Sequence, residues 1–246
     1  MNLILLDSNL EIRFKYTDIN IMPTPNETLR RSHIARRPTF NLHNQKEMDY
    51  FYTSVHDLQT QLGRPLKIVE LGTRRWNPNF STHHKNDFSS REIDISNYVM
   101  TDYLAGDDVD VIADIQQFTK TFPVETIDVI FSGSTYEHIK YPQLASHELM
   151  KSLRQGGLIF IQTHQSFPLH GYPSDYYRFS RVALESLFPK EMGMEVTNSW
   201  YTHMNEIVPS ADWTQAWNIV AESYSNVYII AKKVALTPDQ WIYDLN

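Results

Sequence analysis

The chain has 246 residues, which suits one α/β domain with additions, and its hydrophobic fraction of 41% is enough for a folded core. A formal net charge of -7 argues against a general nucleic-acid binder, because such proteins need a basic face that displaces counterions. The absence of cysteine excludes disulfides, thiolate metal sites and cysteine nucleophiles. We expect neither a signal peptide nor a membrane span, and therefore a cytoplasmic protein without nucleic-acid or membrane partners.

Residues 1–43 differ in pattern from the rest of the chain. Residues 3–6 and 11–16 predict a hairpin, because the intervening Asp-Ser-Asn favours a turn. We expect this N-terminal extension to act as a cap or as an oligomer contact, and in the second case the protein forms a homodimer. Four arginines of this segment could contact an anionic substrate, but we favour the interpretation that they are solvated on the surface: Arg30, Arg31, Arg36 and Arg37.

Helix and strand patterns alternate from residue 44 to residue 246, which we take as the main domain. Short apolar runs predict strands at 66–72, 98–102, 109–114, 127–131, 158–162, 194–201 and 226–234. Apolar residues at three- and four-residue spacing predict helices at 44–63, 143–154, 181–188 and 211–223. We expect Gly156-Gly157 to end the second of these helices. The pattern predicts a Rossmann-like, doubly wound α/β fold, with a mostly parallel seven-stranded sheet and helices on both faces.

An acidic residue stands at or near the end of each of the first three predicted strands: Glu70, Asp102 and Asp114. Ligands of open α/β sheets bind at the carboxyl ends of the strands, so these acids can face one ligand with several donors. An acid such as Asp102 can accept both hydroxyls of a ribose, and Asp114 can accept an adenine amino hydrogen. The pattern favours an adenosine-containing cofactor, although an acid at a strand end is also a common turn or helix cap.

Three further stretches carry a resemblance to a known family. Residues 102–115 follow the second strand into the third, residues 128–139 join the fourth strand to a Glu-His pair, and residues 148–158 run from a helix through a double glycine into the fifth strand. Together and in this order they resemble the class I methyltransferases that use S-adenosylmethionine and release S-adenosylhomocysteine. The resemblance spans about residues 66–188.

The resemblance implies which residues surround the cofactor. Asp102 would bind the ribose hydroxyls, and Asp114 and Ile115 would contact the adenine. The methionine part and the reactive methyl group would lie near Glu70, Gly72, Thr73, Arg74, Ser132 and Gly133. The chain departs from the family where a second glycine is usual in the first loop, because Arg74 stands there. Its guanidinium can instead pair with the cofactor carboxylate.

The acceptor side is expected to involve the segment 163–180, which follows the fifth strand and is rich in polar and aromatic residues. A similar segment occurs in bacterial methyltransferases associated with polysaccharide genes, which implies a small-molecule or saccharide-linked acceptor methylated on O or N. Two histidines are candidate catalytic bases: His138 and His164. The candidate acceptor-binding residues are Tyr136, His170, Asp175, Tyr176 and Arg178, and the open alternative is that His170, Asp175 and Arg178 pair and close the loop.

Two other functions are alternatives to a methyltransferase. A non-catalytic binding or regulatory protein on a degenerate methyltransferase fold is motivated by Arg74. An NAD-dependent oxidoreductase is disfavoured because the dinucleotide fingerprint needs more glycines after Gly72. No metal site is expected, because the adjacent side chains of His83 and His84 diverge. Trp213 and Trp217 share a face of the predicted helix at 211–223, where core packing is favoured over stacking on an acceptor.

Overall fold

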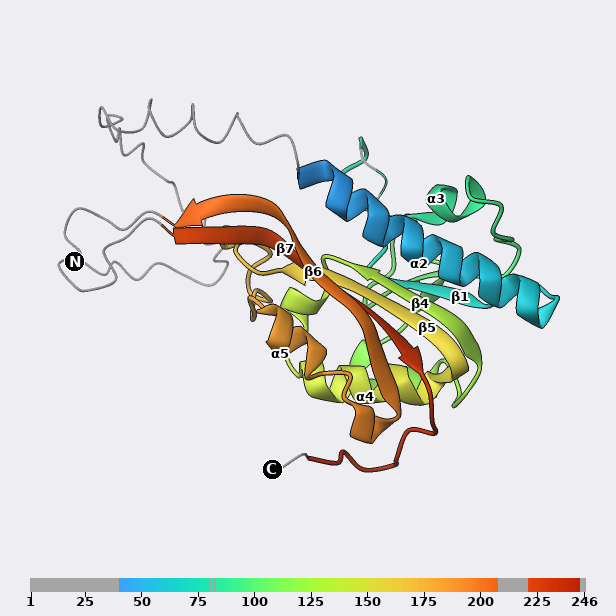
Figure 1. Cartoon of the computed structure of the whole chain (residues 1–246). Helices are drawn as coiled ribbons and strands as arrows, with labels where there is room; N and C mark the ends of the chain where they lie inside the picture. The colour runs from blue at the N-terminus through green and yellow to red at the C-terminus, as the bar shows by residue number, and fades with distance from the viewer. Residues whose placement is uncertain (1–39, 80, 82, 208–220, 244–246) are drawn as a thin grey trace, which may run out of the picture. The chain divides into compact units, whose positions relative to one another are not determined.

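The computed structural model describes residues 40–79, 81, 83–207 and 221–243 of the chain. These residues form a seven-stranded sheet in the order β3-β2-β1-β4-β5-β7-β6, with helices against it (Figure 1). The first five strands in this order are parallel, and β7 pairs antiparallel with both β5 and β6. The expected mostly parallel sheet of seven strands is therefore confirmed. Within the described ranges no helix has the length and apolarity needed to cross a membrane.

The strands fall close to the apolar runs that predicted them. Their bounds are β1 Ile68–Leu71, β2 Tyr98–Asp102, β3 Val111–Ile112, β4 Ile127–Gly133, β5 Leu153–His164, β6 Met194–Ile207 and β7 Ala221–Lys233. In β4, Val129 and Phe131 are buried on one face of the sheet and Ile130 on the other. Strands buried on both faces read as continuous apolar runs, which is why these segments were recognisable in the sequence.

One face of the sheet is covered by α2 (Phe40–Leu62), with the short α3 (Lys85–Ser89) nearby (Figure 1). Phe51 of α2 packs its ring against Phe131 and Phe160, whose rings stack on each other with centroids 4.5 Å apart. Phe131 and Phe160 are register partners on adjacent strands, so their side chains meet directly. This aromatic cluster fixes α2 on the sheet.

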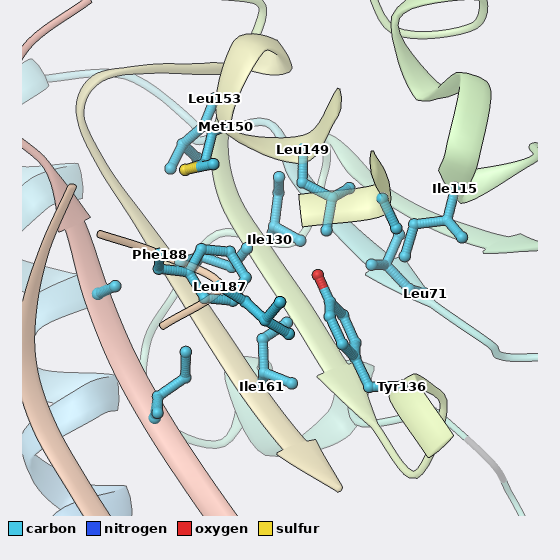
Figure 2. Packing of buried hydrophobic residues seen from close by; sticks show 14 of the residues in the cluster. Leu71, Ile115, Ile130, Tyr136, Leu149, Met150, Leu153, Ile161, Leu187 and Phe188 are labelled. Atoms are coloured by element: carbon cyan, nitrogen blue, oxygen red, sulfur yellow. The ribbon is translucent and has the colours of Figure 1, made fainter. Parts of the chain in front are cut away.

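The opposite face is covered by α4 (Pro142–Ser152) and α5 (Arg181–Glu185), together with short 3-10 turns η1 (Ile115–Lys120), η2 (Tyr136–His138) and η3 (Lys190–Met192). Figure 2 shows Ile130 and Ile161 of the sheet in one buried cluster with Leu149 of α4 and with Phe188, which follows α5. Helices thus lie on both faces of the sheet, as the alternating pattern predicted.

At two places the structure forms a strand where the sequence predicts a helix. The helix expected to reach Arg154 ends at Ser152, because Leu153 turns to an extended conformation and pairs with Ile127 of β4. The pair Gly156-Gly157 therefore lies inside β5 and does not stop a helix. The helix expected at 211–223 is wrong for residues 221–223, which belong to β7. Residues 211–220, including both tryptophans, and the predicted hairpin at 3–16 lie outside the described residues.

Lys233 of β7 is almost fully buried, and its ammonium group closes the end of α4. Its Nζ donates hydrogen bonds to the carbonyl oxygens of Met150 (2.8 Å) and Leu153 (2.7 Å), and Glu125 Oε1 lies 3.5 Å away. Burial lowers the pKa of Lys233, although Glu125 opposes that effect. The ammonium group therefore supplies the donors that the last carbonyls of this helix lack.

We expect Lys233→Met to lower the free energy of unfolding by about 2 kcal/mol, because it leaves two buried carbonyl groups without a donor while keeping the apolar stem. Urea unfolding followed by circular dichroism measures the change. The matched control is Lys232→Met, since the adjacent Lys232 is exposed. An equal loss in both variants would show that the buried hydrogen bonds contribute nothing of their own.

Candidate functional site

The order of the strands reverses between β1 and β4, so the loops that follow these two strands diverge to opposite sides. In open α/β sheets, ligands bind in the crevice that forms at such a point, beyond the carboxyl ends of the strands. Leu71, Ser132 and Ile161 are aligned across β1, β4 and β5 at this edge. The candidate site is therefore built from the segments that follow these residues and from the end of β2.

Gly72 begins the loop after β1 in a conformation that favours glycine, with φ at +74°. A Cβ atom added to it would lie 2.1 Å from Thr135 Oγ1. Thr135 belongs to the loop after β4, so the loops on the two sides of the reversal touch at this point. Gly72 is required here both for its φ and for the close approach of Thr135.

Glu70 is buried, and the structure engages its carboxylate inside the fold. It accepts hydrogen bonds from the backbone N–H of His84 (3.0 Å) and from the Tyr98 hydroxyl (2.5 Å), and His84 Nδ1 lies 2.7 Å from Oε1. The sequence led us to expect Glu70 beside the cofactor. In the structure its oxygens bind His84, the residue before α3, and Tyr98 of β2, so this carboxylate anchors the segment around α3 to the sheet.

Burial acts to lower the pKa of His84, but the hydrogen bond and the charge of Glu70 outweigh it, so the pKa lies above the ordinary value of 6.5. The pair therefore stabilises the fold fully below about pH 6.5, and this contribution is lost as the pH rises through the raised pKa of the folded state. We expect the urea midpoint of the wild type to fall between pH 6 and pH 9, and to fall less in His84→Gln. The control is His83→Gln at the adjacent position. Parallel pH profiles for wild type and His84→Gln would contradict the assignment.

Asp102 lies at the end of β2 with its side chain 18% exposed, and two backbone N–H groups orient its carboxylate. Arg74 N–H donates to Oδ2 (3.1 Å) and Leu104 N–H donates to Oδ1 (3.0 Å). The guanidinium of Arg74 reaches back to the same group, with Nε 4.0 Å from Oδ1, and its stem packs against Gly106. The Arg74 side chain therefore lies along the loop after β2, partly exposed.

The loops after β1 and β2 are joined by a second set of contacts. Arg75 binds the carboxylate of Asp108 through Nε and Nη2, both at 2.7 Å, and its N–H donates to the Asp107 carbonyl. The buried Thr73 hydroxyl donates to the Asp108 carbonyl at 2.6 Å. These contacts hold Thr73 inside the fold, at a position where the resemblance implies contact with the cofactor.

Asp114 and Ile115, expected at the adenine, have structural contacts of their own. The Asp114 carboxylate caps η1 by accepting from Gln116 N–H (2.9 Å), and it also accepts from Gln117 Nε2. Ile115 is part of the core on the α4 face (Figure 2). The helix cap that the sequence left open as an alternative for Asp114 is therefore present.

The end of β4 presents a buried hydroxyl. Ser132 is fully buried, and its Oγ has no hydrogen-bond partner within the described part of the chain. The next residue, Gly133, has ordinary space around it, with His84 Cε1 at 3.5 Å from the position of an added Cβ. Tyr136 points away from this edge into the core, where its hydroxyl lies 3.0 Å from Ser146 Oγ (Figure 2). That burial contradicts the expectation that Tyr136 contacts an acceptor.

Three histidine rings gather around Glu137, the acidic member of the Glu-His pair within residues 128–139. Glu137 is fully buried, and its Oε1 lies 3.0 Å from His164 Nε2, 3.8 Å from His138 Nε2 and 3.9 Å from His170 Nε2. Its Oε2 accepts from the Thr163 hydroxyl at 2.7 Å. Burial acts to raise the pKa of Glu137, but His164 and Thr163 outweigh it and the pKa lies below its usual range. We call Glu137, His138, His164 and His170 the histidine cluster.

The segment after β5 is closed by an ion pair. Arg178 binds Asp175 through Nη1 (2.6 Å) and Nη2 (3.0 Å), and also donates to the Phe167 and Pro168 carbonyls. The guanidinium holds the pKa of Asp175 well below its usual range. The His170 backbone N–H also donates to Asp175 Oδ2 at 2.9 Å, so the loop-closing alternative is observed for all three residues. Tyr176 is partly exposed, and its N–H donates to the Glu137 carbonyl.

Comparisons with known proteins give one family match. The family described as a methyltransferase domain matches residues 73–161, and no curated protein matches the chain. Among solved structures, the chain is similar to a 1,6-didemethyltoxoflavin-N1-methyltransferase of Burkholderia thailandensis (12% identity, 94% of each chain, TM-score 0.48). It is also similar to a SAM-dependent methyltransferase of Archaeoglobus fulgidus (12% identity, 75% of this chain and 94% of that one, TM-score 0.47).

The chain also resembles the CurJ carbon methyltransferase, with 13% identity, 70% of this chain covered and a TM-score of 0.43. It spans about half the length of that structure, of which 49% is covered. The family match is the informative finding, because its residues 73–161 run from the loop after β1 into β5. The matched segment therefore contains Asp102, Ser132 and Glu137, and the methyltransferase-domain match falls on the strand ends that form the crevice.

Proposed function

We propose that the chain is an S-adenosylmethionine-dependent methyltransferase, with its catalytic domain in residues 44–246. The observation that carries the proposal is the match of a methyltransferase domain to residues 73–161, the segment that supplies the crevice at the reversal of strand order. The same match supports S-adenosylmethionine as the cofactor. The acceptor class, the methylated atom and the residue roles below are inferred from the chemistry of the side chains.

The residues at this edge suit a ligand that carries a diol and a charged amino-acid group. A carboxylate has about four acceptor positions, and Asp102 uses two of them for backbone N–H groups, so it can still accept the hydroxyls of a ribose. The unpartnered Oγ of Ser132 is a buried polar atom for which a bound ligand can supply the missing hydrogen bond. Three exposed apolar side chains adjoin Asp102 in the sequence or in strand register: Tyr103, Leu104 and Ile112.

Each of these groups has a separate role in holding the cofactor. Asp102 orients the ribose, and the apolar side chains beside it remove the adenine ring from water. Arg74 can turn its partly exposed guanidinium from Asp102, which lies 4.0 Å away, to the cofactor carboxylate. When bound, S-adenosylmethionine supplies a methyl group for in-line displacement from a sulfonium. The protein's contribution is then to align the acceptor and exclude water.

The acceptor side is proposed to be the face formed by the histidine cluster and the segment after β5. Exposed aromatic and apolar side chains line this segment, including Phe167, Leu169, Tyr172 and Tyr176. Such side chains suit a saccharide-linked or other small acceptor, methylated on an O or N atom. His138 and His164 are the candidates for taking the acceptor proton. Of the two, His138 is the more exposed, with 29% of its side chain accessible against 8% for His164.

The second candidate function is a non-catalytic binding protein on the same fold. It is favoured by one observation, the Arg74 side chain that packs along Gly106 and contacts Asp102. If Arg74 cannot move from this position, it blocks the diol-binding carboxylate. The two candidates differ in a single property, which is saturable binding of the cofactor.

Calorimetric titration with S-adenosylmethionine and S-adenosylhomocysteine separates them. The proposal expects saturable binding of both ligands with one site per chain, and no comparable binding of NAD as the control. A positive result justifies an acceptor screen that starts with sugars and sugar nucleotides. No heat of binding at millimolar S-adenosylhomocysteine would contradict the methyltransferase proposal and favour the non-catalytic one.

A further inference from the structure

The buried carboxylate of Glu137 faces the Nε2 atoms of three histidines. Methyl transfer alone does not explain why these groups are brought together. Glu137 Oε2 is satisfied by the Thr163 hydroxyl, whereas no described group is aligned to donate a hydrogen bond to Oε1. This oxygen is fully buried: His164 Nε2 lies 3.0 Å from it without the alignment of a hydrogen bond, and the Nε2 atoms of His138 and His170 lie 3.8 Å and 3.9 Å from it. An unpartnered buried carboxylate oxygen is costly, so the arrangement calls for a positive partner.

The hydrogen bonds of two imidazole rings, those of His138 and His170, determine which of their nitrogen atoms face the Glu137 carboxylate with a lone pair. His138 Nδ1 lies 2.7 Å from the Ser174 carbonyl oxygen, and His170 Nδ1 lies 3.0 Å from the Pro168 carbonyl oxygen. A carbonyl only accepts, so each Nδ1 carries the hydrogen, and in a neutral ring the lone pair is then on Nε2. Two nitrogen lone pairs and a carboxylate oxygen therefore converge. Three atoms that offer lone pairs to one another, with no hydrogen between them, can together act as the ligands of a cation.

The distances suit a transition-metal ion. The ligand atoms of Glu137, His138 and His170 all lie within 4.8 Å of one another. Bonds of about 2.0–2.1 Å in tetrahedral geometry place ligand atoms about 3.4 Å apart, so small side-chain shifts bring all three into range. Metal ligands are ordinarily oriented by hydrogen bonds to their other polar atoms. Here backbone carbonyls bind the Nδ1 atoms of the two rings, and the Thr163 hydroxyl binds the second carboxylate oxygen of Glu137.

We propose that Glu137, His138 and His170 bind a divalent transition-metal ion, with Zn²⁺ as the probe. Two imidazole nitrogens and one carboxylate oxygen favour Zn²⁺ and similar ions over Mg²⁺ and Ca²⁺, which prefer oxygen ligands. About 30% of each histidine side chain is exposed, so an ion can enter from solvent. Three protein ligands leave a coordination position free, as in catalytic rather than structural zinc sites.

His164 is assigned a supporting role in this site. Its Nε2 lies 3.0 Å from Glu137 Oε1, its Nδ1 lies 3.1 Å from Asn226 Oδ1, and its ring stacks on Phe167. These contacts fix the ring where it orients the carboxylate. An ion bound by His138 takes up the lone pair that a base needs, so His164 is then the remaining histidine of the cluster that can accept a proton.

The test is a calorimetric titration of Zn²⁺ into the untagged full chain after removal of metal with a chelator. We expect one equivalent to bind, a rise in melting temperature with Zn²⁺ and no such rise with Mg²⁺. His170→Ala, at a partly exposed position, is expected to weaken Zn²⁺ binding by at least 100-fold. His164→Gln is expected to keep the stoichiometry and weaken binding by about 10- to 100-fold. The control is His56→Ala on α2, outside the cluster, with unchanged binding.

Two results would overturn the proposal. One is the absence of saturable Zn²⁺ binding and of any Zn²⁺-dependent rise in melting temperature in the wild type. The other is wild-type affinity in His170→Ala, which would place the ion elsewhere. Because the titration uses neither cofactor nor acceptor, its failure leaves the methyltransferase proposal standing, and loss of cofactor binding leaves the metal proposal standing.

Discussion

Replacement of Asp102 by asparagine is expected to weaken S-adenosylhomocysteine binding by about 100-fold while leaving the fold intact. The carboxylate can accept both ribose hydroxyls in charge-assisted hydrogen bonds, each worth about 1.5–3 kcal/mol, and the amide loses the charge and one acceptor. Its new NH₂ group would also face a backbone N–H, from Arg74 or from Leu104. Calorimetric titration of wild type and variant measures the ratio of dissociation constants.

The matched control for this experiment is Asp107→Asn. It removes one negative charge from the same loop, at an exposed position. Asp107 binds Arg75 N–H through its backbone carbonyl, so the substitution leaves that hydrogen bond in place. We expect its affinity for the cofactor to stay within about twofold of wild type, because a screened charge at an exposed position contributes little. Equal affinities of wild type and Asp102→Asn would show that the ribose does not bind at the end of β2.

Gly72→Ala is expected to lower the free energy of unfolding by about 2–4 kcal/mol. A non-glycine residue at φ +74° carries about 1–2 kcal/mol of backbone strain, and a Cβ atom 2.1 Å from Thr135 Oγ1 forces the loop after β4 to move. Because that loop leads into Glu137 and His138 of the histidine cluster, we expect the variant to bind Zn²⁺ more weakly as well. Urea unfolding followed by circular dichroism gives the stability change.

A double-mutant cycle separates the two causes of this loss. Thr135→Ala removes the Oγ1 and Cγ2 atoms that an alanine at position 72 would meet at 2.1 and 3.1 Å. The double variant is therefore expected to regain about 1–2 kcal/mol relative to Gly72→Ala, and the remaining loss measures the backbone strain. If the double variant is no more stable than Gly72→Ala, then Thr135 does not limit the space at Gly72.

The sheet could be predicted largely from the sequence because its strands are apolar on both faces. β2 falls on the predicted residues 98–102, and β4 extends the predicted run 127–131 by two residues. The prediction of helix is wrong at the positions where pairing with a strand distant in the sequence outweighs the local spacing of apolar residues. Leu153 leaves the helix to pair with Ile127, and residues 221–223 are drawn into β7 by residues 205–207 of β6.

The candidate site was less predictable, because its contacts join residues far apart in the chain. Glu137 and His164 are 27 residues apart, and Arg75 and Asp108 are 33 apart, so no local periodicity reveals either pair. Nothing in the sequence around Glu137 indicates that its carboxylate is buried. The sequence points to acids at or near three strand ends, but only the structure shows that Glu70 and Asp114 have internal partners whereas Asp102 stays partly open.

The place of β7 between β5 and β6 has a consequence for synthesis on the ribosome. Chains are made from the N-terminus, so residues 194–207 emerge before the strand that joins them to the sheet. Until residues 221–233 have been made, β5 presents an unpaired edge of apolar residues, and such an edge is prone to join other chains. Completion of the sheet is therefore a late event, and a nascent chain halted before Ala221 is expected to need a chaperone to stay in solution.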